Sequence, residues 1–391
     1  MTAISVSASP AVSVCTLSEI ENDPAWKEAL GRQRKDSRYY RIVEESLHQG
    51  FEHRYFVIRL ADGQTAIQPF FIHDQDLLAG SAMWVQKWME RLRKIFPRLL
   101  KLRTLMIGCA AGEGRLDAAE ADSSRAIEIG QSLANSIKEH SRRLRCGMIV
   151  FKEFPADTRK AMRSLTEAGF TRVPSLPMTR LNIDYANFDE YMAKALSKAT
   201  RKSLRRKFRD AEEGQPITFE MLTDVSEIVD QVHPLYIAVY ERSKMHFEKL
   251  TKEFLCRLGR EMPDKVRFFV WRRAGKIIAF SICMVDGENL FDEYVGLDYS
   301  VALDLHLYFY TLRDIFQWGM QNGFKRYFST ALCYDPKLHL KCTLDPLDLY
   351  VAHTSGLINW FLGRILPWLE PTRNDKTLKE FPNYADLWGV K

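Results

Sequence analysis

Residues 266–330 read VRFFVWRRAGKIIAFSICMVDGENLFDEYVGLDYSVALDLHLYFYTLRDIFQWGMQNGFKRYFST, and the order of patterns in this stretch decides the fold. Two apolar runs flank an Ala-Gly pair, which predicts a β-hairpin, and a third strand is expected at 289–298 after an Asp-Gly turn. From Leu305 onward apolar residues recur at three- and four-residue spacing up to a C-capping Gly323, so a helix follows. Residues 325–334 predict a further strand, and the helix therefore crosses between two strands of one sheet.

The rest of the chain alternates in the same way. A hairpin with an Asp-Gly turn, a strand, a helix, a strand, a helix and a strand are expected before residue 184. The sequence thus predicts an α/β protein with mixed sheets flanked by helices. Four segments are expected: a disordered tail (1–16), a first domain (17–184), a basic linking helix (185–213) and a second domain (214–391). A duplication is one interpretation of this order, although the two halves show no visible identity.

The composition is that of a globular protein. At 391 residues the chain is long enough for two domains, and 46% hydrophobic residues can fill two cores. No apolar run reaches the length of a membrane span, and the first residues lack the basic region of a secretory signal. The seven cysteines are an odd, scattered number, which favours free thiols and a cytoplasmic location. Peripheral attachment at the inner face of the membrane is compatible with this.

No metal is expected. A set of Cys333, His339, Cys342 and His353 would supply zinc ligands, but the spacing matches no standard site.

The net charge of +6 is concentrated in two stripes. Residues 194–209 hold eight basic residues and no acid, and residues 87–103 hold seven basic residues against one Glu. Both stripes are helical in pattern. They are either solvated helix faces or surfaces for a polyanion, with Arg201 and Arg205 as candidate contacts to an anionic substrate.

Four segments, EYVGLD, LHLYFYTLRDIFQWGMQNG, YDPKLHLKC and VAHTS, together resemble one branch of the GNAT superfamily of acyltransferases. This is the FemAB-like branch of peptidoglycan biosynthesis and recognition. Its proteins share a strand ending in Gly, a helix opened by Leu-His, a Lys after the next strand and a downstream His. The resemblance runs from about Ser175 to Ser355. It implies tandem GNAT-like domains that move an acyl group from a thioester, such as acyl-CoA or acetyl-CoA, to the amine of a small molecule or peptide.

The loop before the Leu305 helix is where the resemblance places the CoA pyrophosphate, on backbone amides. The candidates are Gly296, Asp298, Tyr299 and Ser300. The loop departs from the usual GNAT pattern, a Gln or Arg followed by two residues and Gly-x-Gly or Gly-x-Ala. It has one Gly and adds the negative charges of Asp298 and Asp304.

Amine acylation needs a base for the ammonium proton, donors for the oxyanion and an acid for the leaving group. Asp292 and Glu293 are candidates, although strand alternation sends them to opposite faces. His306 matches the Leu-His opening of the family's helix, and Lys337 matches its Lys. Tyr334 precedes Lys337 in the same loop. Each residue alone also fits a surface ion pair or a helix cap.

Two other functions remain open. An aminoacyl-tRNA-dependent ligase acting on a peptide or cell-wall acceptor would use the basic stripe for tRNA. A non-catalytic protein of the same fold would bind an anionic membrane through the basic helices and residues 356–370, GLINWFLGRILPWLE. That apolar segment is too short to span a bilayer, and it either packs on the second domain or lies in a membrane interface. The turn GCAAGEGRLD (108–117) is expected to be a plain tight turn, with a cofactor loop as the alternative. The sequence leaves the oligomeric state open.

Overall fold

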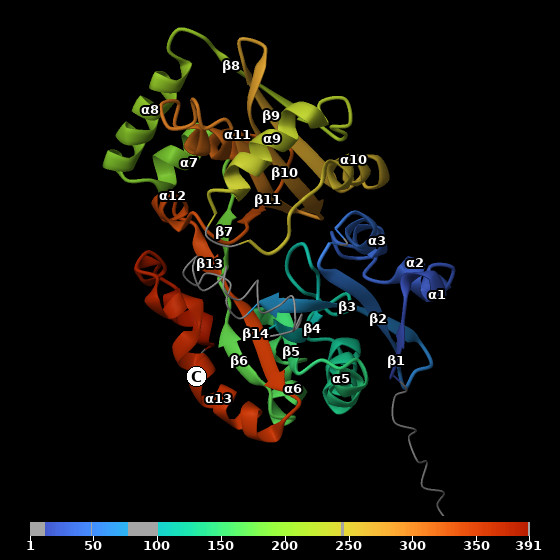
Figure 1. Cartoon of the computed structure of the whole chain (residues 1–391). Helices are drawn as coiled ribbons and strands as arrows, with labels where there is room; N and C mark the ends of the chain where they lie inside the picture. The colour runs from blue at the N-terminus through green and yellow to red at the C-terminus, as the bar shows by residue number, and fades with distance from the viewer. Residues whose placement is uncertain (1–11, 48, 77–100, 244–245, 390–391) are drawn as a thin grey trace, which may run out of the picture. The chain divides into compact units, whose positions relative to one another are not determined.

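The computed structural model describes residues 12–47, 49–76, 101–243 and 246–389. They form two compact units (Figure 1). Unit 1 comprises Met1–Gly31, His48–Ser175 and Leu347–Arg373, and unit 2 comprises Arg32–Leu47, Leu176–Pro346 and Asn374–Lys391. Among the described helices, none has both the length and the apolar run that crossing a bilayer requires.

Unit 1 is built on a seven-stranded sheet of order β1-β2-β3-β4-β5-β14-β6. Its strands are β1 (Val12–Cys15), β2 (Phe51–Arg59), β3 (Thr65–Asp76), β4 (Lys101–Ile107), β5 (Met148–Pro155), β6 (Thr171–Pro174) and β14 (Leu347–His353). Only β4 and β5 pair in parallel, and helix α5 (Ser124–Arg143) connects them. α5 begins where the Ser123 side chain accepts a hydrogen bond from the Ala126 amide, and it buries Ile129 and Leu133 in the core. The shorter elements are α1 (Leu17–Ile20), α2 (Pro24–Glu28), the 3-10 turn η1 (Ala156–Arg159) and α6 (Arg163–Glu167).

Unit 2 is built on a second seven-stranded sheet, of order β8-β9-β10-β11-β12-β7-β13. Its strands are β7 (Met178–Asn182), β8 (Ile217–Leu222), β9 (Val266–Arg273), β10 (Lys276–Asp286), β11 (Asn289–Leu297), β12 (Arg326–Ser329) and β13 (Thr343–Asp345). β11 and β12 pair in parallel, and α11 (Leu307–Gln321) connects them. Its other helices are α3 (Ser37–Ser46), α7 (Phe188–Ala195), α8 (Lys198–Glu212), α9 (Val229–Tyr240), α10 (Lys252–Glu261) and α12 (Tyr334–His339).

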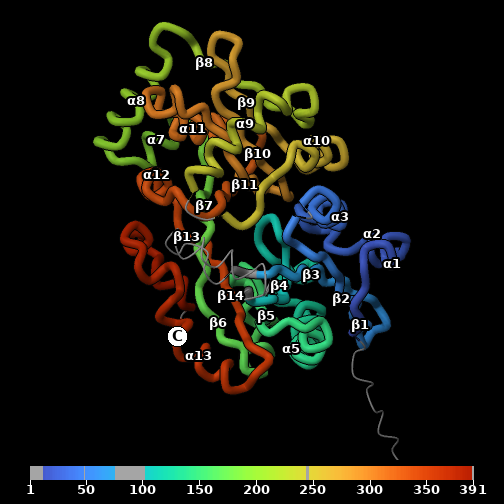
Figure 2. The backbone as a smooth tube through the Cα atoms, viewed as in Figure 1, coloured from blue at the N-terminus to red at the C-terminus, as the bar shows by residue number. Residues whose placement is uncertain are grey.

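The two sheets therefore share one topology: antiparallel strands, one parallel pair crossed by a helix, and two further antiparallel strands. The two units also exchange strands, which the path of the chain in Figure 2 shows. β7 follows the strands of unit 1 in the sequence but pairs with β12 and β13, whereas β14 follows the strands of unit 2 but pairs with β5 and β6. The contiguous ranges expected from the sequence do not follow these units, because each sheet takes a strand from the other half.

The α/β fold class with mixed sheets is confirmed, and so are the predicted hairpins and the helix at 305–320. Three local expectations are corrected. Val12–Cys15, expected within a disordered tail, forms β1, because its apolar Val side chains pack on the core of unit 1. The single basic helix is two helices, since α7 ends at Ala195 with Leu196 as its C-cap and Ser197 N-caps α8. The strand expected at 325–334 stops at Ser329, and α12 begins at Tyr334. The basic helix expected around residues 87–103 falls mostly outside the described residues.

The glycine-rich turn at 108–117 is a buried structural loop. Cys109, Ala110 and Ala111 are inaccessible to solvent. A Cβ on Gly114 would lie 2.5 Å from the Phe154 ring, so the glycine allows close packing on β5. Asp117 accepts hydrogen bonds from the amides of Leu30 and Ile67.

Candidate active site

A β-bulge interrupts β11 in unit 2. Ile282 of β10 pairs with Tyr294, but the next residue, Cys283, pairs with Asp292, so Glu293 is an extra residue on β11. Bulges re-aim side chains and are common beside active sites. Asp292 and Glu293 have different partners on opposite faces of the strand, as alternation requires.

Asp292 lies in a nest of hydroxyl and thiol donors. The Tyr327 hydroxyl donates to Oδ2 at 2.7 Å, and the Ser281 hydroxyl donates to Oδ1. The Cys283 thiol donates to Oδ1 at 3.7 Å. Burial raises the pKa of Asp292, and these hydrogen bonds only partly oppose the effect. The carboxyl group is therefore a better proton acceptor than an exposed aspartate.

Asp292 also marks the point where β11 and β12 part. It is the last residue of β11 that pairs with β12, opposite Ser329. β11 continues to Leu297 along β10, while the chain after β12 turns into residues 330–333 and α12.

Lys337 of α12 reaches this parting from the other side. Its side chain is 2% exposed, and Nζ donates to the carbonyls of Thr330 at 2.6 Å and Leu332 at 2.8 Å. Burial lowers the pKa of Lys337 to about 8, and the negative charge of Asp292 is among the groups that oppose this. The structure thus brings Asp292 and Lys337 within electrostatic range, and both have pKa values displaced toward neutrality. We refer to Asp292, Ser281, Tyr327 and Lys337 as the polar group.

Two tyrosines that sequence reasoning did not select belong to this region. Tyr327 is fully buried, and Tyr308 interacts electrostatically with Asp292. Burial raises the pKa of both hydroxyls well above the usual value, so both stay protonated and can donate hydrogen bonds. The one sequence signal for Tyr327 was its place on the strand expected to run beside Asp292; Tyr308 read as an apolar helix position.

Glu293 is engaged elsewhere. Its carboxylate pairs with Arg34 at 2.8 Å and Lys35 at 3.1 Å, and all three side chains are nearly inaccessible. The Arg34 guanidinium also lies 3.7 Å from the centroid of the Phe291 ring. Glu293 is therefore placed as one member of a buried ion-pair cluster, apart from the polar group.

The two remaining catalytic candidates are His306 and Tyr334, and the Tyr334 ring centroid lies 5.8 Å from Lys337 Nζ. His306 precedes α11 in a left-handed conformation, and burial together with the cations Lys207 and Arg206 lowers its pKa. Tyr334 packs in a core with Leu344 and Phe381, among others, and its hydroxyl donates to the Pro177 carbonyl at 2.9 Å. Its hydroxyl proton is thus used within the fold.

Several backbone amides of the loop before α11 are already hydrogen-bonded within the protein. The amides of residues 301, 302, 305, 306 and 307 all donate to carbonyls of the same loop. Asp298 accepts hydrogen bonds from the Ser300 amide and hydroxyl and pairs with Lys276 at 2.7 Å, so its carboxylate organises the turn that contains Tyr299 and Ser300. Gly296 has a packing role, because a Cβ there would lie 2.7 Å from the Tyr236 amide nitrogen of α9.

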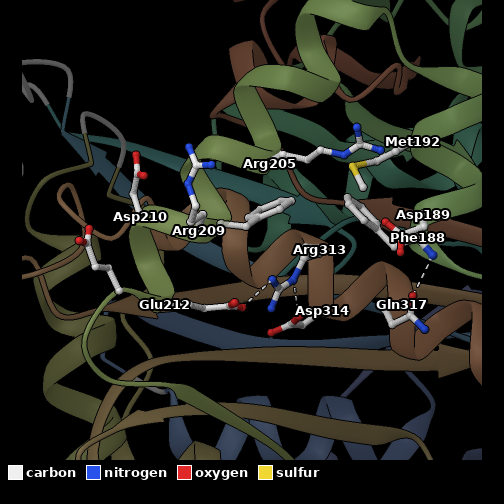
Figure 3. A pocket seen from close by; sticks show the side chains of 12 residues that line it. Phe188, Asp189, Met192, Arg205, Arg209, Asp210, Glu212, Arg313, Asp314 and Gln317 are labelled. Carbon is white, nitrogen blue, oxygen red and sulfur yellow. Dashed lines mark hydrogen bonds and ion pairs between the residues drawn. The ribbon is translucent and has the colours of Figure 1, made fainter.

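The two arginine candidates differ. Arg201 donates to the carbonyls of Leu196 at 2.7 Å and Ala193 at 3.2 Å, so it caps the end of α7. Arg205 is exposed and lines a pocket of about 840 Å³ between α7, α8 and α11 (Figure 3). Arg313 in this pocket is already paired with Glu212 and Asp314. The pocket holds both signs of charge and none of the polar group, and burial raises the pKa of its Asp314 as well.

Both sheets have the same topology, in which a helix connects the two strands of the parallel pair. In unit 2 one strand of this pair, β11, carries a bulge. These features define a tandem protein of the GNAT fold class. The chain belongs to the FemAB-like family, described as peptidoglycan biosynthesis/recognition, whose family model matches residues 45–328. No curated protein was found that matches the sequence.

Solved structures share the fold at low identity. FemX superposes with a TM-score of 0.51 at 11% identity, covering 86% of this chain and 96% of FemX. A C-terminal domain of a lysylphosphatidylglycerol synthetase from Agrobacterium fabrum gives 0.48 at 13% identity, over 80% of this chain and 89% of that domain. A tandem GNAT protein from the clavulanic acid biosynthesis pathway gives 0.46 at 10% identity, over 88% and 99%. Family and fold together support a transferase of acyl or aminoacyl groups.

Proposed function

We propose that this protein transfers an acyl group to the amine of a small molecule or peptide, and that Asp292 and Lys337 handle the protons. The observation that carries the proposal is the polar group itself. A carboxyl with a raised pKa and an amine with a pKa of about 8 interact where two parallel strands part. Pairs of groups with displaced pKa values are typical of acid–base sites.

The roles follow from these pKa values. Asp292 accepts a proton from the acceptor's ammonium group, and the freed amine nitrogen forms a bond to the acyl carbon. Charged Lys337 has three N–H donors, of which two serve the carbonyls of Thr330 and Leu332. The third is available to the developing oxyanion. As the bond from the acyl carbon to the leaving oxygen or sulfur breaks, Lys337 gives that atom a proton and takes one from the attacking nitrogen, which becomes the amide N–H, while Asp292 releases its proton to solvent.

The donor is the second part of the proposal. Acyl-CoA, including acetyl-CoA, is the donor that the GNAT resemblance implies, yet the loop amides before α11 are occupied and Asp298 adds negative charge. An aminoacyl-tRNA is the second candidate, and the exposed basic residues of α8 favour it, because they suit a phosphate backbone. Arg205 belongs to this exposed set, whereas Arg201 does not. The site is proposed to work in the cytoplasm, where both donors occur.

The test measures donor binding and donor use with the full chain. Thermal melts are run with acetyl-CoA, longer acyl-CoAs and free CoA, and total aminoacylated tRNA is tested by gel shift. A ligand at a hundred times its Kd adds about 2.7 kcal/mol, which moves the melt by several degrees. Transfer from the bound donor to a panel of peptides and amines is then compared between the wild type and Asp292→Asn. The proposal fails if neither donor class binds, or if a donor is consumed equally by the folded variant.

A further inference from the structure

Helix α13 (Gly356–Leu369) of unit 1 presents an apolar face to solvent. None of its residues is buried, and it runs beside β14 and β6 (Figure 1). Its large exposed hydrophobic residues are Leu357 70%, Ile358 45%, Trp360 52%, Phe361 51%, Ile365 47%, Trp368 72% and Leu369 70%. Seven of the ten large exposed hydrophobic side chains among the described residues are on this helix. Exposed patches of this kind mark interaction sites.

Contacts on the other side of α13 hold the helix against β14, β6 and the residues before β6. The Asn359 side chain donates to the Gly169 carbonyl at 2.8 Å and accepts from the His353 amide at 2.8 Å. Gly363 lies against β6, where a Cβ would be 3.2 Å from Thr171 Oγ1. Asn359 and Gly363 are four residues apart and so lie on one face, which leaves Phe361 and Trp368 on the opposite side. The apolar face is therefore held outward by specific contacts.

Charge distinguishes between possible occupants of this face. Residues 356–369 contain Arg364 and no acid. Its guanidinium lies 3.5 Å from the centroid of the Trp360 ring, so a cation is positioned along the apolar face. At the start of the helix, Arg142 of α5 donates to the Thr354 carbonyl at 3.4 Å, and the last turn of α5 also carries Arg143.

We propose that α13 docks this protein on an anionic lipid bilayer, lying in the interface with Trp360, Phe361 and Trp368 among the headgroups and upper acyl chains. A helix of 14 residues is about 21 Å long, too short to cross the hydrocarbon core but suited to lie in its surface. Two copies meeting through this face would bring their arginines together, which like-charge repulsion disfavours. Anionic lipids neutralise the same cations.

The experiment is sedimentation of the full chain with vesicles of phosphatidylcholine alone or with 30% phosphatidylglycerol. We expect binding to the anionic vesicles that weakens as salt rises. Leu357→Gln and Trp368→Gln should each weaken it by roughly tenfold, because each removes one apolar side chain from the interface. Leu303→Gln is the matched control, since Leu303 is 76% exposed in unit 2, and it should change binding less than twofold.

A second readout separates the charge from the apolar contact. Arg364→Gln should weaken binding to anionic vesicles by about fivefold and leave any binding to neutral vesicles unchanged. Brominated lipids should quench tryptophan fluorescence in the wild type, and less so in the Trp360→Phe, Trp368→Phe double variant. Circular dichroism and melting curves check that all variants fold.

Three results would overturn the proposal. One is no sedimentation of the wild type with anionic vesicles at millimolar lipid. Another is equal weakening by Leu303→Gln and Leu357→Gln, which would show that the face is not specific. The third is a dimer of the wild type that Leu357→Gln makes monomeric, which would assign the face to a second copy of the chain.

Discussion

The two sheets have the same strand order but different side chains at the end of the parallel pair. In unit 1 the last pair is Ile107 of β4 opposite Phe151 of β5, and both are fully buried. In unit 2 it is Asp292 of β11 opposite Ser329 of β12, with Lys337 beside them. One topology thus supports a plain core in one place and a polar group in the other. The difference teaches that the topology alone does not fix the polarity of this position, which depends on the residues where the two strands diverge.

A second pair of features also corresponds. Each unit buries a carboxylate between two cations: Glu293 with Arg34 and Lys35 in unit 2, and Asp348 with Arg159 and Arg172 in unit 1. The cations differ in exposure. Arg34 is 2% exposed, whereas Arg159 is 25% exposed and reaches water.

The largest expected effect is on the transferase rate, when the polar group of unit 2 is changed and unit 1 serves as the control. Lys337→Met should lower the transferase rate by about 10³-fold, because it removes the amine that serves the oxyanion and the leaving group. Lys152→Met in unit 1 is the matched control, since Lys152 Nζ also donates to a backbone carbonyl, that of Gly112. The assay is single-turnover transfer from whichever donor, acyl-CoA or aminoacyl-tRNA, the binding test selects. Equal losses in both variants would move the chemistry away from unit 2.

The next effect concerns the two buried carboxylates. Glu293→Ala should lower the free energy of unfolding by about 3–5 kcal/mol, because Arg34 and Lys35 would keep buried charges without their partner. Asp348→Ala should cost less, about 2 kcal/mol, since Arg159 and Arg172 can turn toward water. Urea denaturation of both variants measures the difference. If Glu293→Ala instead abolished transfer while leaving stability unchanged, its placement in a structural cluster would be wrong.

The third effect is a pH dependence of the free energy of unfolding, which arises from Lys337 in unit 2. The pKa of Lys337 is about 8 in the folded protein and about 10.4 in an unfolded chain. Between these values the unfolded state binds more protons, so the stability rises with pH; below pH 8 both states are charged and the cost of burial is fully present. The wild type should gain about 3 kcal/mol relative to Lys337→Met from pH 7 to pH 10.5. Urea midpoints at both pH values test this, and parallel curves would contradict it.

The smallest effect separates the two arginines of α8. Arg201→Ala should lower the free energy of unfolding by about 1 kcal/mol, since the last carbonyls of α7 lose their donor. Arg205→Ala should leave stability within about 0.5 kcal/mol and weaken polyanion binding, because Arg205 is exposed. Denaturation and the tRNA gel shift on the same samples provide the two readouts. Stronger loss of tRNA binding in Arg201→Ala would reverse the assignment.

Local patterns predicted the part of the fold that local interactions build. The hairpin of β9 and β10, strand β11 and helix α11 follow from periodicity and turns, and all lie where expected. The exchanged strands could not be found in this way, because a strand's apolar pattern does not name its partner. β14 is an example, because its partner β5 lies about 200 residues earlier in the chain.

The site was predictable in part for the same reason. Asp292 and Lys337 stand near recognisable elements, and the structure brings them together. Arg34 and Lys35, which form ion pairs with Glu293, lie 259 and 258 residues from it in the sequence. No residue near Glu293 in the sequence therefore indicated a buried ion pair. Tyr334 was a candidate for catalysis because it was expected in an exposed loop. In the structure it begins α12, and its side chain is buried in a hydrophobic core.

The exchange of β7 and β14 also orders events during synthesis on the ribosome. β6 lies at the edge of its sheet, and among the described strands it pairs only with β14. The sheet of unit 1 therefore stays incomplete until residues 347–353 have emerged from the ribosome, long after its other strands. In unit 2, by contrast, β7 is synthesised before its partner β12. Pairings of such long sequence separation are slow to form. The unit whose first strands are made earliest thus cannot complete its sheet until most of the other unit has been made.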